Sequence, residues 1–301
     1  MKIRLVKNGI FPVLRGLDGN LSKESPRTGF PLSGTIQGEG KLAGIPVLFI
    51  RTSGCNLRCS WTDDHGKTDI CDTPYSSHNV TENEDWEVED IIRLVKLNLG
   101  NMNHVVISGG EPTIQPVPLV KLASSLKKQL GVHVSLETNG IHYVPELSFY
   151  VDFFSISPKL RSSEPSIEKN KVIAHPVDNN YIRDHARLRK NTIAIQKYIN
   201  SCHNTESYYG DSPDAAVSRR TTKDFQLKFV VAQVQDENEI KEEYLSKLGL
   251  VKNEDVLVMP LGSTPEKAHN HTELAVKMAI RNGWRFAPRI HLDVFGDKEG
   301  T

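Results

Sequence analysis

Two periods of hydrophobic residues alternate along most of the chain. Short alternating or β-branched runs predict strands, and apolar residues spaced three or four positions apart predict helices. The expected strands are residues 46–53, 104–108, 132–137, 150–157, 225–231 and 255–261. The expected helices are residues 87–99, 117–130, 237–249 and 272–283. This alternation of strands and helices predicts an α/β fold with about six parallel strands, best matched by a partial, TIM-like (β/α) barrel.

Three segments break this rhythm. Residues 1–45 are rich in Gly, Ser and Pro, carry little periodicity and end in a Gly-rich loop, and residues 60–85 are polar and expected to be loop. Residues 161–224 are also polar, with one expected helix at 184–201 and a Ser/Asp/Gly-rich loop at 203–222. We interpret 161–224 as an insertion within a single domain that covers residues 1–301.

Composition narrows the class of protein. Hydrophobic residues make up 38% of the 301 positions and charged residues 25%, which is typical of a globular protein. Lys plus Arg and Asp plus Glu both number 37, so no overall basic field favours nucleic acid. No apolar run reaches the roughly 18 residues that span a membrane, and the first 16 residues make a poor signal peptide. We therefore expect a cytoplasmic protein with neither a membrane nor a nucleic-acid partner.

The cysteines suggest a metal site. Cys55, Cys59 and Cys71 lie close together directly after the strand at 46–53, whereas Cys202 is far away and is read as a structural thiol. In a reducing compartment, clustered thiols indicate metal binding or catalysis and not disulfides. Three thiolates leave one iron of a cubane cluster open, which suits a catalytic site. A Cys₃His zinc site with His65, or unrelated buried thiols, remains the alternative.

The segment GTIQGEGKLAGIPVLFIRTSGCNLRCSW, followed by Cys71-Asp72-Thr73, closely resembles the 7-carboxy-7-deazaguanine synthases of the radical S-adenosylmethionine (SAM) superfamily. The usual pattern of that family is C-x3-C-x2-C, and here TDDHGKTDI (62–70) is read as a nine-residue insertion before Cys71. The resemblance continues through GGEP, ETNG, SPK, LKFVV, MPLG and the terminal RIHLDVFG. Residues 161–224 have no clear counterpart in short members of the family.

The resemblance implies a reaction and its cofactors. Cys55, Cys59 and Cys71 would hold a [4Fe–4S] cluster whose open iron binds SAM. Cleavage of SAM would give a 5′-deoxyadenosyl radical that takes hydrogen from C6 of 6-carboxy-5,6,7,8-tetrahydropterin. Ring contraction and loss of ammonia would then yield 7-carboxy-7-deazaguanine, in queuosine-type 7-deazapurine biosynthesis. Mg²⁺ would assist this lyase reaction.

The resemblance also assigns SAM contacts at the strand ends. Gly109 and Gly110 would meet the amino group of SAM, with Glu111 supporting the turn. Further SAM contacts are assigned to Thr138 or Asn139, Ser157 and Lys159. A plain Gly-Gly turn, and helix caps at the later strand ends, are the structural alternatives.

Substrate and Mg²⁺ contacts complete the implied site. Gln37, Glu39 and Arg51 resemble substrate contacts, because a carboxylate can accept two N–H donors of the pterin and a guanidinium binds its carboxylate bidentately. His291 resembles a histidine that reaches the substrate from the last strand end. Thr73 resembles the family's Mg²⁺ ligand. The alternatives are a surface ion pair for Arg51, a structural histidine, and a Thr N-cap or turn hydroxyl.

The resemblance implies two partners, a flavodoxin- or ferredoxin-like electron donor and a second copy in a homodimer. Other functions stay open at this point. One is another radical SAM activity, such as a glycyl-radical activase. A second is a zinc module that binds RNA through residues 183–190 with Arg219 and Arg220. The third is a scaffold that has lost activity.

Overall fold

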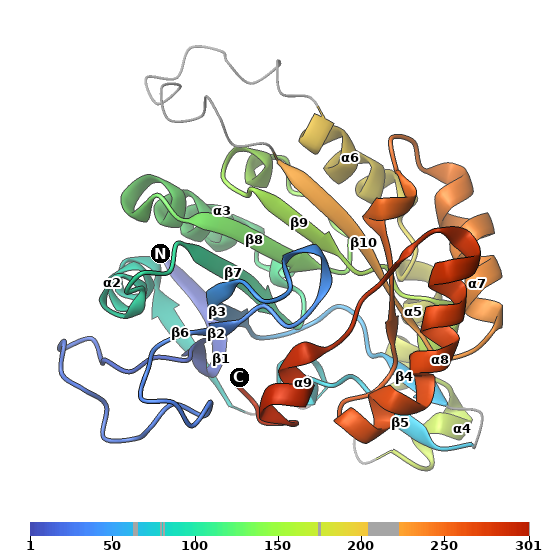
Figure 1. The fold of residues 1–301 in the computed structure, drawn as a ribbon, viewed down its shortest axis with the longest axis horizontal. Coiled ribbons are helices and arrows are strands. Elements are labelled where there is room, and N and C mark those ends of the chain that lie inside the picture. The colour runs from blue at the N-terminus through green and yellow to red at the C-terminus, as the bar shows by residue number, and fades with distance from the viewer. Residues whose placement is uncertain (63–65, 79, 81, 174–175, 204–222, 301) are drawn as a thin grey trace.

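A mostly parallel sheet forms the centre of the molecule in the computed structural model, which describes residues 1–300 except 63–65, 79, 81, 174–175 and 204–222 (Figure 1). The described strands of this sheet run in the order β12-β11-β10-β9-β8-β7-β3-β1-β6. The parallel strands are β12 (Arg285–Phe286), β11 (Val256–Pro260), β10 (Asp224–Val231), β9 (Phe153–Ile156), β8 (His133–Thr138), β7 (His104–Gly109) and β3 (Pro46–Thr52). Added antiparallel strands are β1 (Lys2–Phe11), β6 (Asn83–Glu87) and β2 (Thr35–Ile36). This open, curved sheet is the predicted partial barrel.

Most of the longer helices cover the outer face of the sheet, whereas the short helices α1 (Pro74–Ser77) and α9 (Ile290–Phe295) lie at the cavity (Figure 1). The longer ones are α2 (Val88–Asn98), α3 (Pro116–Ser125), α5 (Asn179–Leu188), α6 (Thr192–His203) and α8 (Pro265–Asn282). The other short ones are α4 (Ile167–Asn170) and α7 (Gln235–Glu239). Capping residues define both ends of α8. Thr264 Oγ1 accepts a hydrogen bond from the backbone N of Lys267 at the start, and Gly283, at φ 67°, ends the helix. No described helix has both the length and the hydropathy needed to cross a bilayer.

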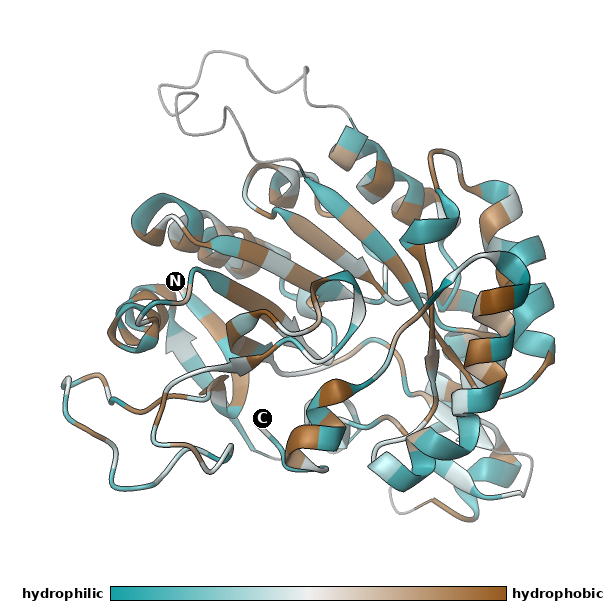
Figure 2. Ribbon diagram, in the orientation of Figure 1, coloured by the Kyte–Doolittle hydropathy of each residue, from teal (hydrophilic) through white to brown (hydrophobic). Residues whose placement is uncertain are grey.

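In β10 the side chains alternate between the two faces of the sheet, as a two-residue period requires. Leu227 and Phe229 belong to the main core under the helices, whereas the alternate residues Gln226 and Lys228 are buried polar residues on the other face. Figure 2 shows the resulting alternation of hydropathy along the strands. The outer face thus supplies the core, and the inner face is free to build a polar cavity.

Three sequence expectations are corrected. Residues 1–45 include the ten-residue strand β1, whose pattern is hidden because its pairing with β3 shifts between Leu5 and Ile10. Residues 60–85 are not simply loop, because they include a hairpin of β4 (Ser60–Thr62) and β5 (Thr68–Ile70), helix α1 and strand β6.

The expected helix at 184–201 is two helices, α5 and α6. They are separated at 189–191, where Asn191 Oδ1 accepts from the backbone N of Ala194 and caps α6. The expected loop at 203–222 lies almost wholly outside the described residues.

Candidate active site

A cavity of about 270 Å³ lies at the carboxyl ends of the parallel strands. This is the edge at which barrels of this type place their chemistry. Of the residues that the resemblance assigns to the cluster, SAM, Mg²⁺ or substrate, all but Glu111 line this cavity: Gln37, Glu39, Arg51, Cys55, Cys59, Cys71, Thr73, Gly109, Gly110, Thr138, Asn139, Ser157, Lys159 and His291. The fold therefore gathers motifs spread over more than 250 positions into one site.

The hairpin explains how Cys71 reaches the other two cysteines. Ser60 pairs with Ile70 across β4 and β5, and the backbone N of Cys71 donates to the carbonyl of Cys59 at 3.2 Å. The nine extra residues therefore loop out and return, so that Cys71 follows Cys59 in space. Lys267 Nζ anchors the hairpin to α8 through Asp69 Oδ1 at 2.6 Å.

The three thiols are free and line the cavity, with Cys59 buried and Cys55 and Cys71 partly buried. Burial raises the pKa of Cys59 to about 12, against the opposing charge of Lys159, and burial also raises the pKa of Cys55. Cys55 and Cys59 therefore hold their protons until a metal displaces them, because ligation requires the thiolate.

The GGEP turn leaves backbone exposed to the cavity. Gly109 has φ 153°, and a Cβ on Gly110 would lie 2.3 Å from the carbonyl O of Gly54 and 2.4 Å from that of Ser76. Only glycine fits at these two positions, because the neighbouring backbone of Thr52, Gly54 and Ser76 leaves no room for a side chain, and both residues line the cavity with main chain alone.

Glu111 ties two strand ends together from beneath the cavity. Its side chain is 0% exposed and accepts from Thr113 N at 3.0 Å, Thr138 Oγ1 at 2.8 Å and Asn139 N at 2.6 Å. Asn139 Nδ2 in turn donates to Asn56 Oδ1 at 2.8 Å in the cysteine loop. The carboxylate thus fixes the GGEP turn against ETNG, a supporting position and not a lining one.

Ser157 and Lys159 face the cavity beyond β9. Lys159 Nζ donates to Ser157 Oγ at 2.8 Å, and neither side chain caps a described helix. Thr138 Oγ1 accepts from Gly140 N at 3.1 Å, which is a local turn bond. The hydroxyl of Thr138 is therefore hydrogen-bonded within the protein, whereas Ser157 and Lys159 face the cavity.

A charged cluster occupies the other side of the cavity. Glu39 forms ion pairs with Lys228 and with Arg289 Nε, the latter at 2.9 Å. Burial opposes the charged form of Glu39, but the attraction of Lys228 and Arg289 outweighs it and holds the pKa of Glu39 far below its usual range. The pKa values of Lys228 and Arg289 are raised despite burial, chiefly by Glu39. All three groups are therefore ionised near neutral pH.

Arg289 links this cluster to the cysteine loop. Its Nη2 donates to Asp72 Oδ2 at 2.6 Å, and its Nη1 donates to the carbonyl of Gly262. Thr73, next in the chain, stands at the N-cap of α1 without capping it, and its Oγ1 lies 3.4 Å from Cys71 Sγ. Asp72 and Thr73 therefore join the thiol side of the cavity to the charged side.

His291 reaches Glu39 from α9 and not from a strand end, which corrects the expected position. Its Nε2 lies 4.0 Å from Glu39 Oε1. The approach depends on Gly38, where a Cβ would come within 2.0 Å of His291 Nδ1. Burial lowers the pKa of His291, against the charge of Glu39.

Gln37 and Arg51 flank the charged cluster. Gln37 Nε2 donates to Glu137 Oε1 at 3.2 Å, and Glu137 Oε2 accepts from Ser108 Oγ at 2.6 Å. Arg51 lies over the rings of Phe11 and Tyr75, with its guanidinium carbon 5.3 and 5.9 Å from their centroids. Arg51 forms no ion pair with any described residue, and its buried Nε has no partner there. The alternative of a surface ion pair is wrong for this arginine.

The alternative zinc site depends on His65, and Cys202 is the fourth cysteine of the chain. Within the described residues, no three His, Cys, Asp or Glu side chains form a site for a single metal ion. His65, proposed as the fourth zinc ligand, lies outside the described residues, as do Arg219 and Arg220. Cys202 is buried in α6 within the main core and does not line the cavity, as expected of a structural thiol.

The donor chemistry fits a [4Fe–4S] cluster with SAM. Three thiols line one side of the cavity, and the backbone of Gly109 and Gly110 faces the same space. Buried polar atoms beside it, Arg51 Nε and Trp61 Nε1, have no described partner and need one.

Sequence reasoning missed three cavity residues: Asp72, Lys228 and Arg289. A signal existed for Lys228, because a lysine in the middle of the apolar strand FQLKFVV has to be paired if it is buried. Asp72 and Arg289 lie beside motif residues, but only the folded chain brings their charges together.

Comparisons with known proteins define the class first. The Radical SAM superfamily model matches residues 49–172, a stretch that holds the cysteines and the GGEP turn. Members of this superfamily use a [4Fe–4S] cluster and SAM.

Full-length relatives then define the family. The 7-carboxy-7-deazaguanine synthase of Halobacterium salinarum is 32% identical over 273 residues, covering 89% of this chain and 90% of that protein. The enzyme of the same name from Rhodopirellula baltica is 32% identical over 265 residues, covering 88% and 85%. The chain belongs to the 7-carboxy-7-deazaguanine synthase family, as its motifs indicate.

A solved structure agrees on the fold. The crystal structure of QueE from Escherichia coli matches with a TM-score of 0.51 at 22% identity, covering 95% of this chain and 93% of that one. The predicted partial barrel is therefore confirmed.

Proposed function

We propose that this chain converts 6-carboxy-5,6,7,8-tetrahydropterin to 7-carboxy-7-deazaguanine with loss of ammonia. The observation that carries this proposal is that one cavity contains both the three thiols and the ionised cluster of Glu39, Lys228 and Arg289. A reductive radical site and a site for a small, polar, acidic heterocycle thus adjoin, and family membership supports the same reaction.

Cys55, Cys59 and Cys71 would hold the cluster, and the exposed backbone of Gly109 and Gly110 would receive SAM. When bound, these cofactors supply one-electron reduction and abstraction of a hydrogen atom from the substrate. Ser157 and Lys159 would contact SAM from the end of β9. Glu111 would hold the end of β8 in place through its bonds to Thr138 and Asn139, one of which would also contact SAM.

The charged side would bind and orient the substrate. Glu39 keeps further lone pairs for the N–H groups of the aminopyrimidinone edge, while Lys228 and Arg289 hold its carboxylate ionised and in place. Arg51, whose Nε lacks a partner, would take the C6 carboxylate. Gln37 and His291 would contact the heterocycle from either side.

Thr73 is proposed as a ligand of Mg²⁺ together with substrate oxygens, since Mg²⁺ prefers hard oxygen donors and keeps several waters. Thr73 lines the cavity, with its hydroxyl 3.4 Å from Cys71 Sγ, where a substrate carboxylate would meet it. We further propose a single domain, with 161–224 inserted. A flavodoxin- or ferredoxin-like electron donor, a homodimer and a cytoplasmic location stay predictions from the resemblance.

The test is anaerobic reconstitution with iron and sulfide, followed by incubation with SAM, dithionite, Mg²⁺ and the carboxytetrahydropterin, with mass spectrometry of the product. Formation of 7-carboxy-7-deazaguanine is expected. Omission of Mg²⁺ from the same mixture tests the metal, and we expect slower turnover without it. A brown protein that cleaves SAM without forming this product would contradict the proposed substrate. A colourless protein that binds zinc would contradict the proposed cluster.

A further inference from the structure

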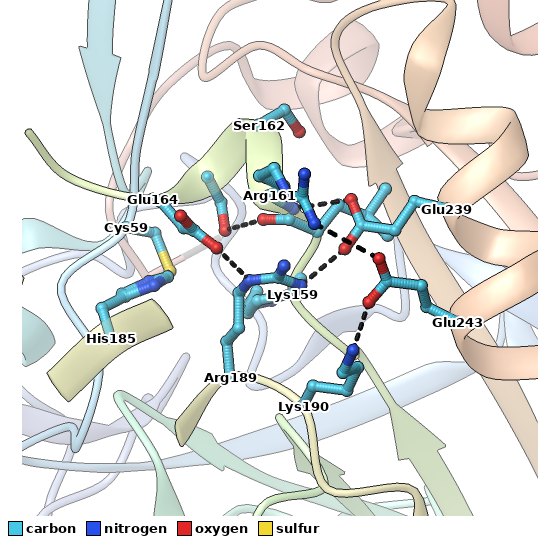
Figure 3. A network of polar contacts seen from close by, with 12 residues as sticks. Cys59, Lys159, Arg161, Ser162, Glu164, His185, Arg189, Lys190, Glu239 and Glu243 are labelled. Carbon is cyan, nitrogen blue, oxygen red and sulfur yellow. Dashed lines mark hydrogen bonds and ion pairs between the residues drawn. The ribbon is translucent and has the colours of Figure 1, made fainter. Parts of the chain in front are cut away.

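The inserted segment forms one wall of the cysteine site. Helix α5 places His185 against the cysteine loop, with its Nε2 3.5 Å from Cys59 Sγ (Figure 3). Both side chains are buried, His185 at 1% and Cys59 at 6% exposure. The segment that the sequence left without a role thus contacts a cluster ligand directly.

A buried ion-pair network holds this wall in position. Arg189, at the end of α5, pairs with Glu164 and, at 2.6 Å, with Glu239, and it donates to the carbonyl of Lys159 at 3.1 Å (Figure 3). Its side chain is only 4% exposed. Such a network fixes α5 to the barrel, because a buried guanidinium without its carboxylates would be costly.

Two more contacts join the insertion to the cysteine loop itself. The guanidinium of Arg58, within the CNLRC motif, stacks at 4.1 Å on the ring of Tyr181 in α5. Lys169 Nζ donates to the carbonyl of Ser60 at 2.7 Å, in the hairpin between Cys59 and Cys71. The described part of the insertion is therefore packed against the cysteine loop on both sides of Cys59.

The chemistry of His185 follows from its surroundings. Its Nε2 is the ring nitrogen that faces Cys59 Sγ, and an imidazole nitrogen beside a sulfur either donates or accepts a hydrogen bond. A thiolate in a cluster accepts hydrogen bonds and donates none. Nε2 must then carry the proton, which agrees with the absence of any described partner for Nδ1.

We propose that His185 is a positioning residue that donates its Nε2–H to the Cys59 thiolate of the bound cluster and raises the cluster's reduction potential. Reduction adds negative charge, and an N–H donor stabilises the more negative state. His185 acts on sulfur and is not an iron ligand. The inference rests on the cluster part of the proposed function and not on the substrate.

The experiment compares the reconstituted wild type with His185→Ala, His185→Gln and Arg187→Ala, without SAM or substrate. Glutamine can place an amide N–H near the Nε2 position, and Arg187 is an exposed residue of the same helix. The readouts are iron per chain and the midpoint potential from an anaerobic redox titration followed by electron paramagnetic resonance. Circular dichroism melting checks that each variant folds.

We expect four irons per chain in all four proteins. His185→Ala should lower the equilibrium constant for reduction about tenfold, which is about 59 mV for one electron. His185→Gln should recover most of the potential, and Arg187→Ala should leave it unchanged. A wild-type potential in folded His185→Ala would overturn the inference, as would loss of iron from folded His185→Ala and His185→Gln together, since that result indicates ligation. Absence of a cluster from wild type would instead overturn the proposed function.

Discussion

Buried polar groups are paired at one edge of the parallel sheet and partly unpaired at the other. At the amino edge, the polar groups form hydrogen bonds and an ion pair with one another and with the backbone; they belong to His104, His133, Ser135, Asp152 and Lys127. His104 Nε2 lies 2.7 Å from Ser135 Oγ and 3.2 Å from His133 Nδ1. Asp152 accepts from Lys127 Nζ at 2.7 Å and from the backbone N of Val134 at 2.8 Å.

At the carboxyl edge, polar groups face a cavity and several remain incomplete. Arg51 Nε, Trp61 Nε1 and His185 Nδ1 are buried without a described partner. The ionised pair of Glu39 and Lys228 also faces this space. Buried polar groups cost free energy when they are unpaired, so their concentration at one edge marks where ligands belong. The amino-edge cluster, whose polar groups bond to one another, is the arrangement expected of groups that only stabilise the fold.

The largest expected effect is loss of the site at the carboxyl edge without loss of the fold. Cys59→Ala should remove the cluster and all turnover above background, because two thiolates cannot replace three. Iron analysis and product mass measure this, with Cys202→Ala as the matched control that keeps both. Turnover retained in Cys59→Ala would contradict the assignment of the thiols.

Glu39→Gln sharpens the comparison on the substrate side. Lys228 and Arg289 would lose their shared carboxylate, and substrate N–H groups would lose a charged acceptor, which costs about 2–5 kcal/mol for buried charge pairs. We expect kcat/KM to fall on the order of 10²–10³-fold, with iron content unchanged. Unchanged kcat/KM in a folded variant would remove Glu39 from the substrate site.

Asp152→Ala removes the central acceptor of the amino-edge cluster. Lys127 and the amide of Val134 would lose their buried acceptor, so the free energy of unfolding should fall by about 3–5 kcal/mol. Urea unfolding measures this, and Asp152→Asn, which retains an acceptor for Val134, should lose less. If the folded Asp152→Ala enzyme lost cluster or kcat/KM, the two edges would not be separable.

A smaller effect concerns pH. Burial and the neighbouring His133 lower the pKa of His104 to about 4, from about 6.5 in an unfolded chain. The unfolded state therefore binds more protons between these values, and the stability contributed by neutral His104 is full above about pH 6.5 and lost as pH falls to about 4. This amounts to about 3 kcal/mol.

Urea unfolding of the cluster-free protein across that pH range should show a shallower pH dependence in His104→Gln than in wild type. The comparison between the two cancels the histidines that do not contact His104, and His133→Gln measured alongside separates the contribution of the neighbour. Equal slopes would mean that His104 titrates alike in the folded and unfolded states.

Different physics decides which features the sequence could predict. The parallel strands come from local apolar runs such as HVVIS and FQLKFVV, and the cysteine loop from a compact motif, so both were predictable. Strand β1 and the 62–70 hairpin are stabilised by pairing with distant or interrupted partners, which no local period records.

The same reason explains the missed site residues. The side chains of Lys228 and Arg289 are buried because Glu39 neutralises them from a distant part of the chain, and the exposed Asp72 pairs with Arg289 in the same way. His185 lies in a polar helix whose sequence looks solvent-exposed, and only the Arg189 network turns that side chain onto Cys59.

The central claim is that the substrate binds in the same cavity as the thiols. Its most direct test is turnover of carboxytetrahydropterin deuterated at C6, with mass spectrometry of the product and of the SAM recovered under anaerobic conditions. We expect deuterium from C6 to appear in the 5′-deoxyadenosyl group as product forms, recovered as 5′-deoxyadenosine or, where that group returns a hydrogen and rejoins methionine, as SAM. Product formation with no deuterium in SAM, its methionine or its 5′-deoxyadenosine would contradict that claim.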